Sequence, residues 1–256
     1  MELNRIYNED CLEGMKRIPD KSVDMILCDL PYGTTANKWD AIIPFEPLWE
    51  QYERVIKDNG AIVLTGSQPF TSALVSSNLN LFRYEWIWQK QLATGFLNAK
   101  RMPLKNHENV LVFYKKRPTY NPQMTNGKPY KCKYGKNTKT KASVNYGGNY
   151  KTEYKEDAKN DGFRYPLTVQ KFQTDRGLHP TQKPLALFEY LIKTYTNKNE
   201  IVLDNCMGSG TTAIACINTE RNFIGFELDK TYYEKSLKRI KEHTTQTDIF
   251  DVLEGN

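Results

Sequence analysis

Five consecutive residues, Asp29-Leu30-Pro31-Tyr32-Gly33, bring together groups that can hold a flat heterocycle bearing an amino group. The carboxylate of Asp29 and the backbone carbonyl of Leu30 are two hydrogen-bond acceptors, and Pro31 restrains the backbone beside them. The aromatic ring of Tyr32 can stack on a base. A strand that ends in an Asp-capped proline turn is also a common structural feature, so the motif alone leaves both readings open.

The exocyclic amino group of adenine or cytosine suits this pair of acceptors. It is a poor nucleophile because its lone pair is delocalised into the ring. Acceptors that bind its two hydrogens favour a pyramidal nitrogen with a localised lone pair, which can attack a sulfonium methyl group in line. Such acceptors act on the charge that develops in the transition state. The chemistry predicted at Asp29 is therefore methylation of an amino nitrogen.

A second segment, Ile201 to Asp229, reads as a strand, a glycine-rich turn, a helix, a second strand and an acid. The glycines of Gly208-Ser209-Gly210 let the backbone approach a ligand at the helix N-terminus. Glu227, at the end of the second strand, can accept from both hydroxyls of a ribose. The pattern fits NAD, FAD or S-adenosylmethionine, or a tight turn without a ligand. Ala213 at the third glycine position weakens the two dinucleotide readings.

The surrounding elements predict an α/β fold with a mostly parallel, twisted sheet and helices on both faces. Short apolar runs read as buried strands, and the stretches between them as helices. Ligands bind beyond the carboxyl ends of such strands, so Asp29 and Gly208 should share one rim. The expected strands are 23–28, 61–65, 84–88, 109–114, 201–203 and 222–226; the expected helices are 47–57, 68–77, 185–194, 211–218 and 229–241, with a turn at 59–60.

Residues 115–177 interrupt this pattern. The stretch from Lys115 to Arg176 holds 15 Lys and Arg against 5 Asp and Glu, a balance of +10 in a chain whose net charge is +6. Such asymmetry fits a surface that faces a polyanion, or a solvated surface loop. Seven tyrosines argue against complete disorder, which usually lacks aromatic residues. The segment is either a disordered insertion or a small recognition module.

The bulk composition predicts a soluble cytoplasmic protein. The chain has 256 residues with 39% hydrophobic and 26% charged residues, enough for one large domain with an insertion. The five cysteines have no zinc-site spacing, which indicates a reducing compartment and no metal. The N-terminus lacks the features of a signal peptide, and no apolar run is long enough to cross a bilayer.

The motifs together resemble the β-class DNA amino-methyltransferases. DLPYG resembles the family's D-P-P-Y motif, and LDNCMGSGTT resembles its cofactor motif. HPTQKP at 179–184, RIYNEDCLEGM near the N-terminus and NHENVLVFYKK from Asn106 resemble further segments of the family. The catalytic motif precedes the cofactor motif, which is the β-class order. The resemblance covers nearly the whole chain except 115–177, where the family carries its target-recognition region.

This resemblance implies an S-adenosylmethionine-dependent methyltransferase fold with circularly permuted motif order. It implies site-specific methylation of the N6 amino group of adenine in double-stranded DNA by base flipping, since Asp is more typical of the adenine enzymes. Methylation of cytosine N4 is the alternative; RNA or protein-amide methylation, a non-catalytic DNA-binding role and a Rossmann oxidoreductase are weaker ones. A homodimer and a partner restriction nuclease are expected. Residues 1–114 form the catalytic half, 115–177 the recognition region and 178–256 the cofactor-binding half.

The resemblance also assigns roles to individual residues. Asp29, Leu30, Pro31 and Tyr32 are the expected catalytic group. Asp10 should meet the adenine end of the cofactor, although it can also cap a helix that begins near Cys11. Lys183 is placed near the cofactor's tail, or is a solvated lysine. The other expected cofactor residues are Cys11, Asp29, Asp204, Asn205, Cys206, Gly208, Ser209, Gly210, Thr211, Glu227 and Leu228.

Two departures from the family pattern bear on this site. Asn205-Cys206 stands where the family often has Pro-Phe, so an aromatic contact with the cofactor is lost. Leu30 replaces the first proline of D-P-P-Y. Its carbonyl remains, but the loop is expected to be less rigid.

Overall fold

The computed structural model describes residues 1–34, 40–132, 138–139, 153–154, 158–175 and 182–254. The chain forms two compact units, one from Met1–Asn121 with Thr168–Asn256 and the other from Pro122–Leu167. We call them the sheet unit and the inserted unit. Among the described residues, no helix has the length and apolar character needed to cross a membrane.

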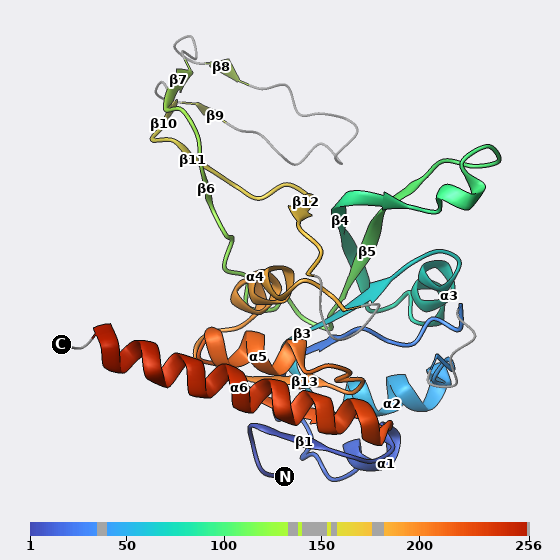
Figure 1. Cartoon of the computed structure of the whole chain (residues 1–256). Helices are drawn as coiled ribbons and strands as arrows, with labels where there is room; N and C mark the ends of the chain where they lie inside the picture. Colours follow the sequence, from blue (N-terminus) through green and yellow to red (C-terminus); the bar gives the residue numbers. More distant parts are fainter. Residues whose placement is uncertain (35–39, 133–137, 140–152, 155–157, 176–181, 255–256) are drawn as a thin grey trace. The chain divides into compact units, whose positions relative to one another are not determined.

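The sheet unit is built on eight strands in the order β1-β14-β13-β2-β3-β5-β4-β12 (Figure 1). Neighbouring strands pair in parallel, except that β5 is antiparallel to both β3 and β4. The predicted mostly parallel sheet is thus confirmed. The strands are β1 (Arg5–Tyr7), β2 (Val23–Cys28), β3 (Ile56–Gly66), β4 (Phe82–Thr94), β5 (Lys105–Phe113), β12 (Val169–Phe172), β13 (Ile201–Asp204) and β14 (Asn222–Phe226).

Helices cover both faces of this sheet. Ile26 and Cys28 of β2 belong to an apolar cluster with α1, α2 and α3, whereas Met25 and Leu27 belong to a second cluster with α4 and α5. Because both faces are buried, β2 is an almost unbroken apolar run. The helices are α1 (Cys11–Met15), α2 (Phe45–Val55), α3 (Phe70–Ser77), α4 (Leu185–Tyr195), α5 (Thr211–Asn218) and α6 (Lys230–Glu254), with the short helix η1 at Phe96–Asn98.

The predicted strands and helices are all present; 23–28, 222–226 and 211–218 have the predicted ends, and the ends of the others are shifted. The turn predicted at 59–60 is wrong, because residues 56–66 form the single strand β3. The pairing of β3 with β2 jumps from Val23↔Ile56 to Met25↔Ala61, so Asn59 and Gly60 lie in an irregularity of the ladder. Strands β1 and β12 were not predicted, and β4 and β5 continue well beyond the predicted ranges.

The inserted unit consists of short antiparallel ladders. Strand β6 (Thr125–Asn126) pairs with β11 (Phe163–Arg164), β7 (Tyr130–Cys132) with β10 (Ala158–Asn160), and β8 (Thr138–Lys139) with β9 (Glu153–Tyr154). The guanidinium of Arg164 lies over the ring of Tyr130, 4.8 Å from its centroid. Residues 122–167 form a narrower unit than the predicted region 115–177, because β12 joins the main sheet.

Candidate active site

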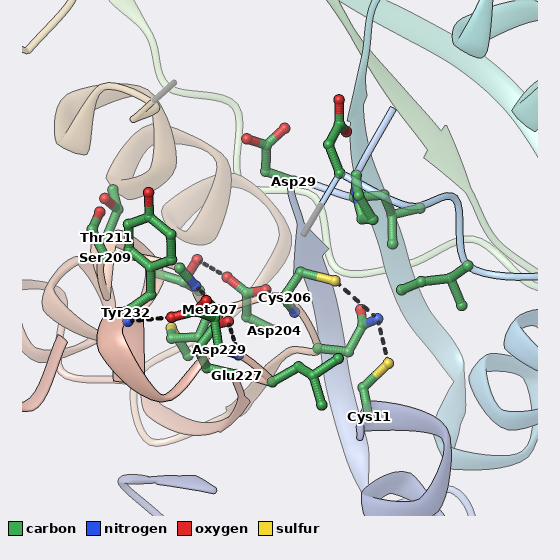
Figure 2. A pocket seen from close by; sticks show the side chains of 18 of the residues that line it. Cys11, Asp29, Asp204, Cys206, Met207, Ser209, Thr211, Glu227, Asp229 and Tyr232 are labelled. Carbon is green, nitrogen blue, oxygen red and sulfur yellow. Dashed lines mark hydrogen bonds between the residues drawn. The ribbon is translucent and has the colours of Figure 1, made fainter. Parts of the chain in front are cut away.

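The two sequence motifs line one cavity of about 600 Å³. Asp29 follows β2, the glycine-rich turn follows β13, and Glu227 follows β14; these three strands are parallel neighbours in the sheet. Their carboxyl ends therefore meet at one rim, as expected for an open α/β sheet. Figure 2 shows the Asp204, Met207 and Glu227 side chains close together below Asp29. A volume of this size suits a ligand such as a nucleoside derivative.

Two hydroxyl groups donate to one oxygen of the Asp29 carboxylate. Tyr32 donates its hydroxyl to Oδ1 over 2.8 Å, and the hydroxyl of Thr65, at the end of β3, donates to the same atom. The Tyr32 ring is stacked on Phe70, with ring centroids 5.0 Å apart. Burial raises the pKa of the Tyr32 phenol well above its ordinary value, so the hydroxyl remains a neutral donor.

The loop after the motif is tied to a second carboxylate. The backbone N–H groups of Tyr32 and Gly33 donate to Asp40 Oδ1 over 2.7 and 2.9 Å, and the N–H of Thr34 donates to Oδ2 over 2.9 Å. Asp40 is buried and lines the same cavity. A carboxylate that accepts several backbone N–H groups makes strong charge-assisted bonds. Asp40, which the sequence reasoning missed, thus holds the loop after the D-L-P-Y motif.

Lys183 approaches Asp29 from the segment before α4. Its Nζ donates to Asp29 Oδ2 over 2.6 Å and lies 3.3 Å from Glu108 Oε2, while Lys90 pairs with the other oxygen of Glu108. Lys183 is only 6% exposed, so the alternative of a solvated lysine is wrong. The four side chains form a line of alternating charge, which we call the charge chain. It links Asp29 to the strand pair β4–β5.

Opposing effects set the protonation of this chain. Burial lowers the pKa of the Lys183 amine, but Asp29 and Glu108 outweigh it, and the net pKa lies above its ordinary value. Burial raises the pKa of the Glu108 carboxyl, but Lys183 and Lys90 outweigh it, and the net pKa is lowered. Both groups are therefore charged at neutral pH, and Lys183 holds the Asp29 carboxylate in place as an ion-pair partner.

The glycine-rich turn is held by Glu227. Its Oε2 accepts from the N–H of Gly208 over 2.7 Å, and its Oε1 accepts from the N–H of Asp229 over 2.8 Å. Burial raises the pKa of Glu227, and these backbone donors partly offset the effect. Gly210 adopts φ +82° just before α5, and a Cβ there would lie 3.2 Å from the side chain of Ser236. Gly210 therefore shapes the turn, and it does not line the cavity.

Asn205 explains how the chain accommodates one departure from the family pattern. Its Nδ2 lies 3.5 Å from the Cys11 sulfur and 3.6 Å from the Cys206 sulfur (Figure 2), and its Oδ1 accepts from the Tyr52 hydroxyl. Asn205 is buried, so its amide connects α1 and α2 to the cavity floor. Polar contacts replace the aromatic packing that Pro-Phe would give.

Asp10 and Asp204 also have structural partners. Asp10 accepts from the N–H groups of Leu12 and Glu13, so it caps α1 as the alternative reading proposed, and it also lines the cavity. Asp204 accepts from the N–H of Cys206 over 3.0 Å and from the hydroxyl of Thr212. Burial raises the pKa of Asp204 to about 6. Its ionisation therefore opposes folding.

The raised pKa of Asp204 means that its ionisation lowers the free energy of unfolding, and Asp204→Asn should remove this pH-dependent loss of stability. Below about pH 4 Asp204 is protonated in both folded and unfolded states, and above about pH 6 it is ionised in both, so the cost develops between these values and is complete at neutral pH. The quantity of interest is the free energy of unfolding of the variant minus that of the unmodified protein. We expect this difference to be larger at pH 8 than at pH 4, by up to about 3 kcal/mol. Asparagine can still accept from Cys206 and donate to Thr212.

Urea unfolding of the cofactor-free protein at several pH values measures this difference. Comparing the two proteins at each pH cancels the titration of all other carboxylates. A difference in unfolding free energy that stays constant from pH 4 to pH 8 would contradict the assignment.

Nearly all the residues predicted from the sequence meet at this cavity. The lining includes Asp10, Cys11, Asp29, Leu30, Pro31, Tyr32, Lys183, Asp204, Asn205, Cys206, Gly208, Ser209, Thr211, Glu227 and Leu228. Part of the HPTQKP segment, residues 179–181, lies outside the described residues. The prediction missed other lining residues, which include Asp40, Gln182, Phe188, Met207 and Tyr232. Gln182 and Met207 lie within the HPTQKP and LDNCMGSGTT motifs, whereas nothing in the local sequence distinguishes Asp40, Phe188 and Tyr232 from ordinary core or loop residues.

Comparisons with known proteins agree with this geometry. A DNA methylase family model (N6_N4_Mtase) matches residues 23–238. The chain is 28% identical to the type II methyltransferase M2.MboI of Moraxella bovis over 93% of this chain and 88% of that protein. It is also 28% identical to the DNA adenine methyltransferase YhdJ of Escherichia coli K12, over 93% and 83% of the two chains.

A solved structure supports the same conclusion. The crystal structure of the M1.HpyAVI-SAM complex superposes with a TM-score of 0.62 at 28% identity, covering 92% of this chain and 98% of that one. The fold, the shared rim and the family match together identify the chain as a member of the DNA methylase family, an S-adenosylmethionine-dependent DNA methyltransferase.

Proposed function

We propose that this protein methylates the N6 amino group of adenine in duplex DNA. The observation that carries the proposal is the meeting of Asp29, Tyr32 and Glu227 at a single cavity. An acceptor and an aromatic ring for the target base lie on the same rim as an acid for a nucleoside ribose. A Rossmann oxidoreductase does not require the Asp29 and Tyr32 pair. A non-catalytic DNA-binding protein requires neither that pair nor the acid Glu227.

The lower part of the cavity fits S-adenosylmethionine. Glu227 is the acid that accepts from the ribose hydroxyls, and Gly208, Ser209 and Thr211 line the cavity at the start of α5. Asp10 lines the same cavity and is the proposed partner of the adenine end. When bound there, the cofactor supplies an electrophilic sulfonium methyl group. Asp204, buried beneath the turn, keeps the turn in place through Cys206 and Thr212.

The catalytic loop holds and orients the target amino group. The Asp29 carboxylate and the Leu30 carbonyl accept its two hydrogens, and the ring of Tyr32, which is supported by Phe70, stacks on the base. Lys183 and Thr65 hold the Asp29 carboxylate in position. The target base is paired inside a duplex, so it must be extruded to reach this loop, at a cost of a few kcal/mol in lost stacking.

Adenine is proposed over cytosine for two reasons. The first residue of the tetrapeptide is Asp29, and the relative YhdJ is a DNA adenine methyltransferase. We expect DNA methylated by this protein to yield N6-methyladenine when it is digested to nucleosides and the products are weighed. DNA treated without cofactor is the control. N4-methylcytosine in the absence of N6-methyladenine would contradict the choice of base.

The partners and the recognition region complete the proposal. The inserted unit, within residues 115–177, reads the target sequence, because it combines basic side chains with exposed aromatic ones such as Tyr130, Phe163 and Tyr165. The protein acts as a homodimer in the cytoplasm, in the same cell as a cognate restriction nuclease.

Sedimentation of the purified protein tests the dimer. Sequencing of DNA from expressing cells, with detection of modified bases, gives the site.

A further inference from the structure

The β4–β5 hairpin presents large apolar side chains to solvent. Leu97 is fully exposed and Phe96 is 71% exposed at its tip, and Leu92 and Met102 are also exposed nearby. Figure 1 shows the hairpin, in green, continuing past the neighbouring strands of the sheet to this tip. Contiguous exposed apolar groups mark binding sites more often than ordinary surface.

The tip is an ordered structure. Gly95 adopts φ +92° and lets the chain turn into η1. Backbone bonds then close the turn, with the N–H of Asn98 donating to Gly95 over 2.9 Å and the N–H groups of Arg101 and Met102 donating to Asn98 over 2.8 and 3.0 Å. The apolar side chains are therefore held outward by a compact turn.

The charge of the hairpin has one sign. From Gln89 to His107 the sequence contains four Lys and Arg residues and no Asp or Glu. Lys90 and Lys105 are bonded at the base, to Glu108 and Ser67. Lys100 and Arg101 are exposed beside the tip and form no ion pair with any residue that the structure describes. Such a surface attracts a polyanion.

The strand register places this tip beyond the catalytic edge. Thr65, which bonds Asp29, is opposite Val110, and Val110 is opposite Trp86. Strand β4 runs parallel to β2 and β3, and its pairing with β5 continues from Val110 to Lys105, which is opposite Thr94, so the hairpin extends five residues of ladder past the level of Asp29 on the same side. At about 3.3 Å per residue this is roughly 16 Å, more than the ~12 Å width of a DNA major groove.

From these observations we infer that the tip of the β4–β5 hairpin is an apolar wedge that enters the DNA beside the target base. Phe96 and Leu97 fill the space left when the base is extruded, and Lys100 and Arg101 bind the flanking phosphates. Apolar wedges flanked by basic groups stabilise unstacked base steps in this way. The inference rests on the proposed function, because it requires an extruded base.

A second copy of this chain is a poorer partner for the same surface. Two such tips would bring like charges together without a compensating acid, which disfavours a symmetric contact between them. DNA complements both the basic and the apolar side chains of the tip, because its phosphates are anionic and its bases have flat apolar faces.

The test compares two duplexes that carry the target base. In one duplex the base is normally paired, and in the other it lies opposite an abasic site, so it is already unpaired. Single-turnover transfer of labelled methyl into DNA is measured for the Phe96→Ala/Leu97→Ala variant and for Leu79→Ala. Leu79 is also exposed, but it precedes Phe82, at the end of β4 that is far from the tip.

We expect the wedge variant to lose about 10- to 100-fold in rate on the paired duplex and to stay within about threefold of the unmodified protein on the abasic duplex. Leu79→Ala should match the unmodified protein on both. Lys100→Ala/Arg101→Ala should lower the slope of log affinity against log salt by about 1.8, since two phosphate contacts are lost.

Three outcomes would overturn the wedge: an equal loss on both duplexes, no loss on either, or a change of the variant from dimer to monomer in sedimentation. The last outcome would assign the tip to a subunit contact. Because the label is counted in DNA whichever base receives it, a wrong choice of base leaves this comparison intact. Absence of any transfer by the unmodified protein would instead refute the proposed function.

Discussion

Asp29→Ala should reduce methyl transfer to DNA by about 10³-fold or more while the protein still binds S-adenosylmethionine. The substitution removes the acceptor that orients the target amino group and leaves Glu227 and the glycine-rich turn unchanged. The buried ammonium of Lys183 keeps a partner, because Glu108 Oε2 lies 3.3 Å away. The variant should therefore fold. Single-turnover rates with saturating DNA, together with cofactor binding by calorimetry, measure the two effects separately.

A suitable control for Asp29 is Asp20→Ala. Asp20 is an exposed acid paired with Arg54 and does not line the cavity. Its removal should leave both the rate and the cofactor affinity within about threefold of the unmodified protein. Methyl transfer by Asp29→Ala at the rate of this control would refute the role given to the D-L-P-Y motif. Loss of cofactor binding in Asp29→Ala would instead place the carboxylate in the cofactor site.

The second large effect is expected at Glu227. Glu227→Ala removes the acid proposed to accept from the ribose hydroxyls, and it also frees the N–H groups of Gly208 and Asp229. A hydrogen bond to a charged group contributes about 1.5–3 kcal/mol. Loss of the two proposed bonds from the ribose hydroxyls therefore corresponds to at least about a 100-fold weaker Kd for S-adenosylmethionine. The kcat at saturating cofactor should change by no more than about threefold, because Asp29 and Tyr32 are untouched.

Titration calorimetry and steady-state rates distinguish this binding role from a catalytic one. Glu220→Ala serves as the matched control, because Glu220 is an exposed acid in the turn just before β14 and pairs with Lys198. An unchanged Kd in Glu227→Ala would exclude the ribose assignment. A fall in kcat without a change in Kd would indicate that the side chain acts on the reacting groups.

Much of the fold was predictable because its signals are local. The strand Val23–Cys28 is a continuous apolar run since helices cover both faces of the sheet. The turn Gly208–Gly210 needs glycine because two of its residues have positive φ. Such local signals are sufficient to predict that Asp29, Glu227 and the glycine-rich turn share one rim.

Features that depend on long-range pairing were not predictable. The three-residue strand β1 and the short polar strand β12 are stabilised by their neighbours in the sheet, and neither has an apolar pattern of its own. Lys183 lies 154 residues from Asp29 in the chain, so its ion pair is visible only in the fold. The length of the β4–β5 hairpin likewise follows from strand register, which composition does not encode.

The bonds from Asp40 to the N–H groups of Tyr32, Gly33 and Thr34 determine when conformational entropy is lost. Fixing the backbone of one residue costs roughly 1–2 kcal/mol. Here three consecutive residues beside the target-base site are ordered as the chain folds, before any substrate arrives. The binding energy of an incoming base is therefore available for its extrusion and alignment. One buried carboxylate outside the recognised motifs thus moves an ordering cost from each catalytic cycle to the single event of folding.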